Sequence, residues 1–366
     1  MADLFTYLAW RGDLSFVQAG FNPVDNLIMS CLAYVQLEKA LPAGRKKTLA
    51  QAAADYLALP EEERRARSGE DERLLKAAAD SHRFGRVELL GAVDILDPAA
   101  EKQFAAVTFQ LENGEAYVAY RGTDNSLTGW KEDFNMAYLP VVPSQTEAAV
   151  YLERAAAAVP GGIRVGGHSK GGNLAVFAAA VSQPSLQRRL LAVYNNDGPG
   201  FSSRMLQSPG YRAVASCIHT YIPQSSVVGM LLDHEESYAV VHSRRVGLLQ
   251  HDPYSWDVMG PDFVYVSGLT PAGQMIDRTL KYWVAQMSME ERADFVEGLF
   301  SLLAAREKGQ ELLPDDWKGN LKAVLKGWRK LPADTRKSLK GPLSRLIRTA
   351  ARVMQAGLED KGRSEA

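Results

Sequence analysis

The middle of the chain alternates between strand-like and helix-like segments, and this alternation constrains the fold more than any other feature. The apolar runs IRVGG (163–167) and LLAVYNND (190–197) follow the helix-like segments 146–159 and 172–182, respectively. Two more strand-like runs come later, at 213–222 and 237–249. Parallel strands need a crossover, which is usually a helix. The pattern therefore predicts an α/β fold with a mostly parallel sheet flanked by helices.

The segments on either side differ from this middle part. Three strand-like runs lie between residues 86 and 122, with Asn113-Gly114 as a hairpin turn. Before them the chain looks helical, with Asn22 and Pro23 placed to start a helix, and after about Thr270 it looks helical again. We therefore expect a helical N-terminal elaboration (1–80), a core (81–285) and a helical C-terminal extension (286–366).

Composition excludes several classes of protein. The chain has 366 residues, 46% of them apolar, and a net charge of −1. A near-neutral chain has no global attraction to nucleic acid. Only two cysteines are present, and the longest apolar run, Leu174–Val181, is too short to span a bilayer. The first residues lack the basic start of a secretion signal. We expect a cytoplasmic protein.

Four glycines surround a serine and a lysine in VGGHSKGGNLAVF (165–177). A phosphate-binding P-loop would need Lys-Ser/Thr after Gly167, but His168 and Ser169 follow instead, and the dinucleotide-binding pattern is also out of register. Gly167-His168-Ser169-Lys170-Gly171 does match the G-x-S-x-G nucleophile elbow, between a strand and a helix. Gly167 and Gly171 would relieve the crowding of that turn. The pattern favours Ser169 as a nucleophile over a merely exposed serine.

A second segment, YRGTDNSLTGWKEDF (120–134), ends an earlier strand. A nucleophile elbow needs two N–H donors for the oxyanion, one after the nucleophile and one from such a loop. Lys170 would supply the first donor and Thr123 the second. Alone, the RGT triplet is also compatible with a simple polar turn.

The pattern YRGT, W, DF and then GHSKGGNLA resembles the class 3 lipases, which are α/β-hydrolases, and is most similar to their bacterial Mbeg-like branch. Further stretches fit that branch: YLAWRGDLSF, FNPVDNLI, NNDGPGF and QHDPYSW. The resemblance covers about Leu4 to Trp283 and implies an α/β-hydrolase fold and a serine hydrolase. The basic segment after about Pro314 lies outside it.

A serine hydroxyl needs a base to remove its proton, and the base needs an acid to orient it. Of the later histidines, His219 and His242 lie in strand-like runs that suggest burial, and His234 is expected at a solvated helix end. His251 follows a strand and opens a proline-containing loop, where α/β-hydrolases carry the base. The resemblance points to the same residue, so we predict His251.

The acid is less clearly marked in the sequence. Asp197 ends the strand after the nucleophile helix, where it could also serve only as a turn former. The class 3 lipases usually place their acid one strand later, but this chain has Ser225 and Ser226 there. We therefore predict Asp197, with Asp233 as the fallback.

Two basic features remain. The side chain of Lys170 is expected in solvent, although it could contact an anionic substrate. The segment 318–352 contains eleven lysines or arginines and one acidic residue. Apolar residues line one face of a helix there, and cations such as Arg336, Lys337, Lys340 and Arg348 cover the rest. Such a helix could lie on an anionic membrane, but docking on its own domain is favoured.

These features predict a serine hydrolase that cleaves a carboxylic ester of a lipid or a small acyl compound. The same triad could instead cleave an amide or a thioester, and a non-catalytic binding protein with this fold is a further alternative. No cofactor or metal is implied, because no Cys/His spacing or acidic cluster resembles a metal site. The expected partner is the acyl substrate, with no nucleic acid.

Overall fold

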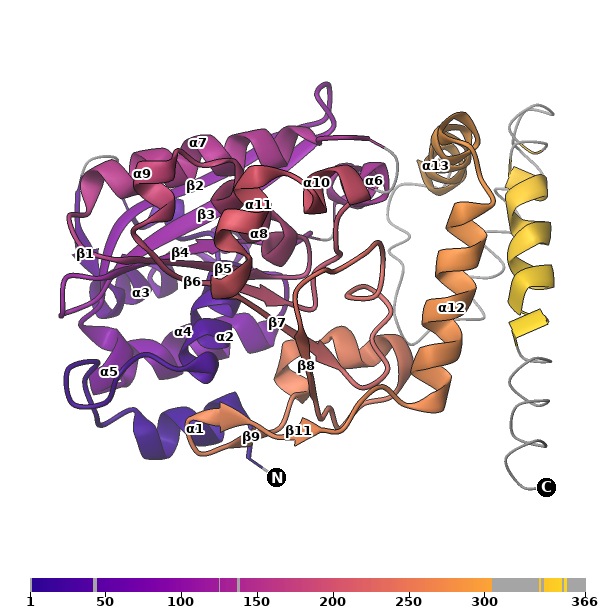
Figure 1. Cartoon of the computed structure of the whole chain (residues 1–366). Helices are drawn as coiled ribbons and strands as arrows, with labels where there is room; N and C mark the ends of the chain where they lie inside the picture. The colour runs from indigo at the N-terminus through magenta and orange to yellow at the C-terminus, as the bar shows by residue number, and fades with distance from the viewer. Residues whose placement is uncertain are drawn as a thin grey trace, which may run out of the picture.

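The computed structural model describes residues 2–41, 45–124, 126–136, 139–304, 336, 339–350 and 352–353. Its centre is a nine-stranded sheet in the order β1-β2-β3-β4-β5-β6-β7-β8-β11 (Figure 1). Five neighbouring strands are parallel and form the middle of the sheet: β4 (Ala116–Tyr120), β5 (Ile163–His168), β6 (Leu190–Asn196), β7 (Ile218–Pro223) and β8 (Tyr238–Val241). The chain therefore has an α/β fold whose sheet is parallel in its middle, as expected.

Both ends of the sheet are antiparallel, so the sheet as a whole is mixed. On one side lie β1 (Lys47–Thr48), β2 (Glu88–Asp97) and β3 (Lys102–Gln110), and on the other β11 (Tyr265–Val266). Strand β3 is antiparallel to both β2 and β4 because short connections join them. Gly114, in the turn between β3 and β4, has φ of +80°, a conformation that glycine adopts without strain. A hairpin this tight can only join antiparallel strands.

Helices cover both faces of this sheet. On one face, α7 (Pro143–Ala158) and α8 (Lys170–Val181) pack on Val118 and Tyr120 of β4. On the other face, helices of the first 85 residues pack on Tyr117 and Ala119 of the same strand. Successive residues of a strand point to opposite faces, so β4 contributes to both cores. The helices of that second face are α1 (Leu4–Arg11), α2 (Pro23–Leu32), α3 (Leu49–Leu57), α4 (Gly69–Asp80) and α5 (His82–Gly85).

The remaining elements are short and lie in the connections. They are the helices α6 (Leu127–Asn135), α9 (Pro184–Gln187), α10 (Ser203–Leu206) and α11 (Pro209–Val214), the strands β9 (Val258–Met259) and β10 (Asp262–Phe263), and the 3₁₀ turns Leu37–Lys39, Glu61–Glu63, Ala215–Cys217, Gly247–His251 and Pro253–Ser255. The division of the chain at residues 80 and 285 stays a prediction.

The C-terminal part begins with α12 (Pro271–Ala285) and α13 (Met289–Ala304) (Figure 1). The described helical residues 339–350 lie beside them. The indole of Trp283 donates a hydrogen bond to the Pro342 carbonyl at 2.8 Å, and Arg345 pairs with Glu291 at 2.7 Å. These contacts agree with docking of the basic helix on the rest of the chain. Residues 305–335 and Lys337 of the basic segment lie outside the described residues.

Among the described residues, none of the helices combines the length and the apolar character that crossing a membrane requires.

Candidate active site

Ser169 stands between the end of β5 and the start of α8. Its backbone has φ of +60° and ψ of −134°, a combination that non-glycine residues rarely adopt. Holding a residue in such a region costs about 1–3 kcal/mol and persists only where the surroundings enforce it. A strained strand-to-helix turn of this kind presents the serine hydroxyl at the carboxyl end of the sheet.

Gly167 and Gly171 lie where the backbones of this turn are most crowded. A Cβ atom at Gly167 would lie 2.3 Å from the carbonyl carbon of Gly171, and one at Gly171 would lie 2.1 Å from the carbonyl oxygen of Tyr120. Both distances are far below van der Waals contact. Glycine at both positions is therefore required for this turn to pack against strand β4.

The loop after β4 lies directly against the serine. A Cβ atom at Gly122 would lie 3.1 Å from the Cβ of Ser169 and 2.5 Å from the carbonyl oxygen of His168. The next residue, Thr123, donates a hydrogen bond from its hydroxyl to Asp133 of α6. Of the two predicted oxyanion donors, Lys170 follows Ser169 at the start of α8, and Thr123 follows Gly122 in the loop that lies against the serine.

His251 and Asp197 are in contact. The Nδ1 atom of His251 lies 2.7 Å from Oδ2 of Asp197, which is fully buried at the end of β6. A carboxylate can only accept, so Nδ1 carries the proton of the neutral imidazole. The Nε2 atom is then left as the acceptor, which is the form that a general base needs. Strand β6 adjoins β5, so the acid and the serine lie at neighbouring strand ends.

Ser226 lies after β7, where an acid was expected from the class 3 lipases, and it binds Asp197 instead. Its hydroxyl donates to Oδ1 of Asp197, and the Gly229 N–H donates to the Ser226 oxygen at 2.9 Å. A Cβ at Gly229 would lie 2.3 Å from Oδ1 of Asp197, so this loop closes tightly over the carboxylate. Asp233, the fallback acid, is exposed, and its backbone pairs with Phe201.

The other histidines take different positions from those expected. His219 on β7 is exposed and stacks on Tyr194, so the expectation of burial was wrong for it. His242 is half-buried and lies 2.6 Å from Asp257. The expectation that His234 is solvated was also wrong: its side chain is 5% exposed and lies 3.0 Å from Glu236.

The side chain of Lys170 is buried, with 1% exposed, so the expectation that it reaches solvent was wrong. Its ammonium group donates to the carbonyl oxygen and to Oε1 of Gln103, both at 2.8 Å, and to Oε2 of Glu132 at 3.0 Å. A buried charge needs a charged partner and satisfied hydrogen bonds. Here all three ammonium donors have acceptors.

Two adjacent carboxylates of α6 bind the side chains of the two predicted oxyanion donors. Glu132, also fully buried, binds Lys170 and accepts from the Ser144 N–H at 2.8 Å. Asp133 accepts from Thr123, and burial raises its pKa to about 6 although the nearby Lys170 charge opposes the shift. No sequence pattern marks this arrangement, because it depends on contacts across tens of residues.

The described residues contain no group of three or more His, Cys, Asp or Glu side chains that could hold a metal ion.

Parallel strands, a strained serine turn at the end of one strand, and a histidine bound to a carboxylate at the end of the next strand are features of the α/β-hydrolase class. Within it, the chain belongs to the Mbeg1-like family, whose family model matches residues 78–301. The resemblance to the Mbeg-like branch is thereby confirmed. None of the curated proteins matches the chain. Among solved structures, an M37 lipase shares 14% identity, with a TM-score of 0.36 over 58% of this chain and 71% of that chain.

Proposed function

We propose that this protein is a serine hydrolase that cleaves carboxylic esters of lipids or small acyl compounds. The observation that supports this most is the contact between His251 and the buried Asp197, beside a serine held in a strained turn. A strained backbone at a nucleophile and a fully buried carboxylate that orients a histidine are costly to maintain without a chemical role.

In this proposal, Nε2 of His251 removes the proton of Ser169 while the hydroxyl oxygen attacks the acyl carbon. The N–H groups of Lys170 and Thr123 bind the oxyanion, each contributing about 3–4 kcal/mol in comparable sites. The imidazolium, stabilised by Asp197, then protonates the departing alcohol and leaves an acyl-enzyme. A water molecule then attacks the acyl-enzyme in the same way, which releases the carboxylic acid product and restores Ser169.

The lipid part of the proposal rests on the resemblance to class 3 lipases and on apolar side chains near the base. Val246 and Leu249 precede His251 in the same loop and are 77% and 47% exposed. Exposed apolar side chains beside a site are suited to binding an apolar acyl chain. An amidase or thioesterase would use the same triad, so the substrate bond must be tested directly.

A fluorophosphonate probe tests the nucleophile without knowledge of the substrate. We expect the probe to label the wild type and the Ser203→Ala control, whose serine is exposed, and not Ser169→Ala. A folded wild type that stays unlabelled would instead favour a non-catalytic binding protein. Turnover of p-nitrophenyl esters, anilides and acyl thioesters of increasing chain length then decides the bond and the acyl length. Higher turnover of amides or thioesters would overturn the ester proposal.

We also propose that the protein is cytoplasmic and contacts anionic membranes through the basic helix. Leu343 and Ile347 are 38% and 71% exposed, on the side of the helix that is not docked. Arg336, Lys340 and Arg348 are also exposed. Exposed apolar side chains flanked by cations are the pattern of helices that lie on anionic lipid surfaces.

A further inference from the structure

Tyr34 reaches the active site from the N-terminal helices. It follows the end of α2 and is 2% exposed. Its hydroxyl oxygen lies 2.9 Å from Nδ1 of His168, the residue just before the nucleophile. The same oxygen would lie 2.2 Å from a Cβ atom at Gly122. Tyr34 therefore fills the space between the loop after β4 and the end of β5.

His168 continues this contact to the predicted base. Its Nε2 atom lies 2.7 Å from the main-chain carbonyl oxygen of His251. A carbonyl only accepts, so Nε2 of His168 must carry the proton, and Nδ1 must then accept from the Tyr34 hydroxyl. Burial, together with the charges of His251 and Arg67, holds the pKa of His168 well below its ordinary value, so the ring is neutral. The His251 carbonyl thus selects the tautomer of His168, and the Tyr34 hydroxyl binds the nitrogen that is left as acceptor.

The two histidine rings also pack together. Their centroids are 4.6 Å apart with 35° between the planes, and the Trp256 ring packs edge-on with the His168 ring at 6.4 Å between centroids. His251 is consequently held at two points: Asp197 binds its imidazole, and His168 binds its main chain.

The position of Tyr34 is itself fixed by Arg67, two residues before α4. The guanidinium of Arg67 lies 3.9 Å from the centre of the Tyr34 ring and pairs with Asp71. Asp71 in turn accepts a hydrogen bond at 2.8 Å from the hydroxyl of Tyr254, three residues after His251. The N-terminal helices therefore contact the His251 loop both through Tyr254 and through Tyr34 and His168.

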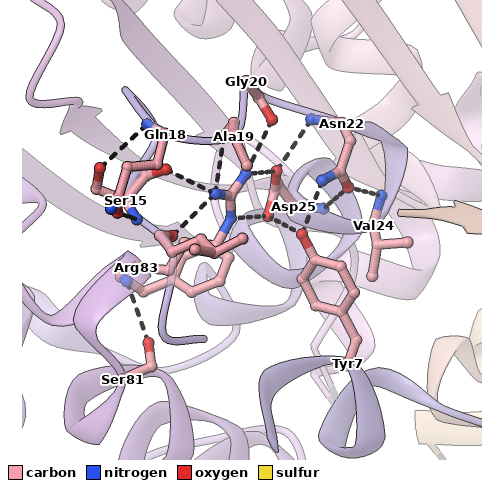
Figure 2. A network of polar contacts seen from close by, with 12 residues as sticks. Tyr7, Ser15, Gln18, Ala19, Gly20, Asn22, Val24, Asp25, Ser81 and Arg83 are labelled. Atoms are coloured by element: carbon pink, nitrogen blue, oxygen red, sulfur yellow. Dashed lines mark hydrogen bonds and ion pairs between the residues drawn. The ribbon is translucent and has the colours of Figure 1, made fainter. Parts of the chain in front are cut away.

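Helix α2 cannot easily shift, because it is anchored on both sides. Asp25 receives two hydrogen bonds from Arg83, at 2.6 and 2.8 Å, and Figure 2 shows Arg83 enclosed by these acceptors and by carbonyls of the preceding loop. Asn26 donates to Asn196 at the end of β6 at 2.8 Å. Both anchors are fully buried.

We propose that Tyr34 and His168 are positioning residues that set the main-chain position of His251, so that the N-terminal helices complete the active site. This inference rests on the proposed function of His251 as the base. It goes beyond the family match, since Tyr34 precedes the matched residues 78–301.

The tautomer of His168 is the first readout and needs no turnover. In protein with ¹⁵N-labelled histidine, we expect the Nε2–H form of His168 in the wild type and in Tyr151→Phe. Tyr151 is the control because its hydroxyl bonds Thr108, away from His168. Tyr34→Phe should keep the Nε2–H form, because the His251 carbonyl still selects it, but should shift the Nδ1 resonance, because Nδ1 loses its hydrogen-bond donor. An Nδ1–H form in the wild type, or an unchanged spectrum in Tyr34→Phe, would overturn the proposal.

Kinetics supply the second readout, because a misplaced base lowers kcat more than it changes KM. We expect Tyr34→Phe to lower kcat about tenfold and His168→Leu about a hundredfold, since an error of about 1 Å in placement can cost that much. His168→Gln places an amide N–H near the position of Nε2 and should recover most of the His168→Leu loss. Tyr34→Phe and His168→Gln should unfold at the wild-type urea midpoint within experimental error.

The kinetic outcome overturns the proposal if Tyr34→Phe keeps at least half of the wild-type kcat, or if His168→Gln is as impaired as His168→Leu. If the wild type hydrolyses no substrate and binds no fluorophosphonate, the proposed function fails. The ¹⁵N measurement would still report whether Tyr34 binds Nδ1 of His168, so the two failures are distinguishable.

Discussion

His251 and Asp197 lie 2.7 Å apart, from Nδ1 to Oδ2, although 54 residues separate them in the chain. Asp197, the proposed acid, follows the end of β6, beside the strand that ends just before Ser169. The loop after β7 contributes a serine hydroxyl to the same carboxylate. The proposed acid thus lies one strand earlier than the class 3 lipases usually place theirs, and Ser226 at the later position binds it.

Replacing Asp197 should therefore remove most of the activity. In Asp197→Asn the amide would favour the wrong tautomer of His251, and the kcat for a short ester should fall by about 10⁴-fold. The control is Asp233→Asn, which changes the exposed fallback acid. Its kcat should stay within about twofold of the wild-type value, because substitutions at exposed positions usually have small effects. Equal losses in the two variants, or a loss confined to Asp233→Asn, would contradict this assignment.

Lys170 should contribute strongly to stability. In Lys170→Met the Glu132 carboxylate stays buried without its cation, so the free energy of unfolding should drop by about 3–5 kcal/mol. Urea unfolding followed by fluorescence measures the change. Arg73→Met, which breaks an exposed pair with Glu70, should cost less than about 1 kcal/mol. The double variant Lys170→Met/Glu132→Gln should regain part of the loss, and the idea fails if it does not.

Asp133 should make stability depend on pH below neutrality. Burial raises its folded-state pKa to about 6, above the ordinary value of 3.8, so the charged form is disfavoured in the native state. The cost of this charge is absent below pH 4 and fully present above pH 6. Between these values the wild type should lose on the order of 2 kcal/mol relative to Asp133→Asn, which cannot titrate. Unfolding curves of the two proteins that stay parallel from pH 4 to 8 would refute this.

The basic helix should bind anionic vesicles. We expect the wild type to co-sediment with vesicles containing phosphatidylserine at low salt and to be released at high salt, since each cation near such a surface adds about 1 kcal/mol. Leu343→Glu/Ile347→Glu should abolish binding, and Val17→Glu, at another exposed apolar residue, should not. Equal partitioning onto neutral vesicles, or no partitioning at all, rules out the membrane proposal.

The sequence was sufficient for the features that local rules determine. The alternation of strands and helices predicted the parallel middle of the sheet, and the G-x-S-x-G pattern predicted a turn at Ser169, because both depend on neighbouring residues. Asn113-Gly114 predicted a hairpin for the same reason. The sheet edges were less predictable, since β11 pairs with β8 through contacts that no short pattern specifies.

The supporting contacts of the site could not be predicted in this way. Lys170 looked solvated because lysine usually is, and its burial depends on Glu132 and Gln103 lying opposite it. Tyr34 contacts His168 across 134 residues, and nothing near either residue indicates the other. Ser226 was noticed only as a missing acid. Such contacts follow from the packed fold and not from local sequence.

The anchoring of Arg83 has a practical consequence. This residue lies inside the matched segment 78–301, while its acceptors, Asp25 and the carbonyls of Leu14, Ser15, Ala19 and Gly20, all precede that segment. A shortened chain that started at residue 78 would lose all of these acceptors, and it would also expose the apolar face of the sheet that the N-terminal helices cover. The matched segment 78–301 is therefore not a suitable truncation of this protein. A shortened version for expression should keep Leu4 and the N-terminal helices that follow it.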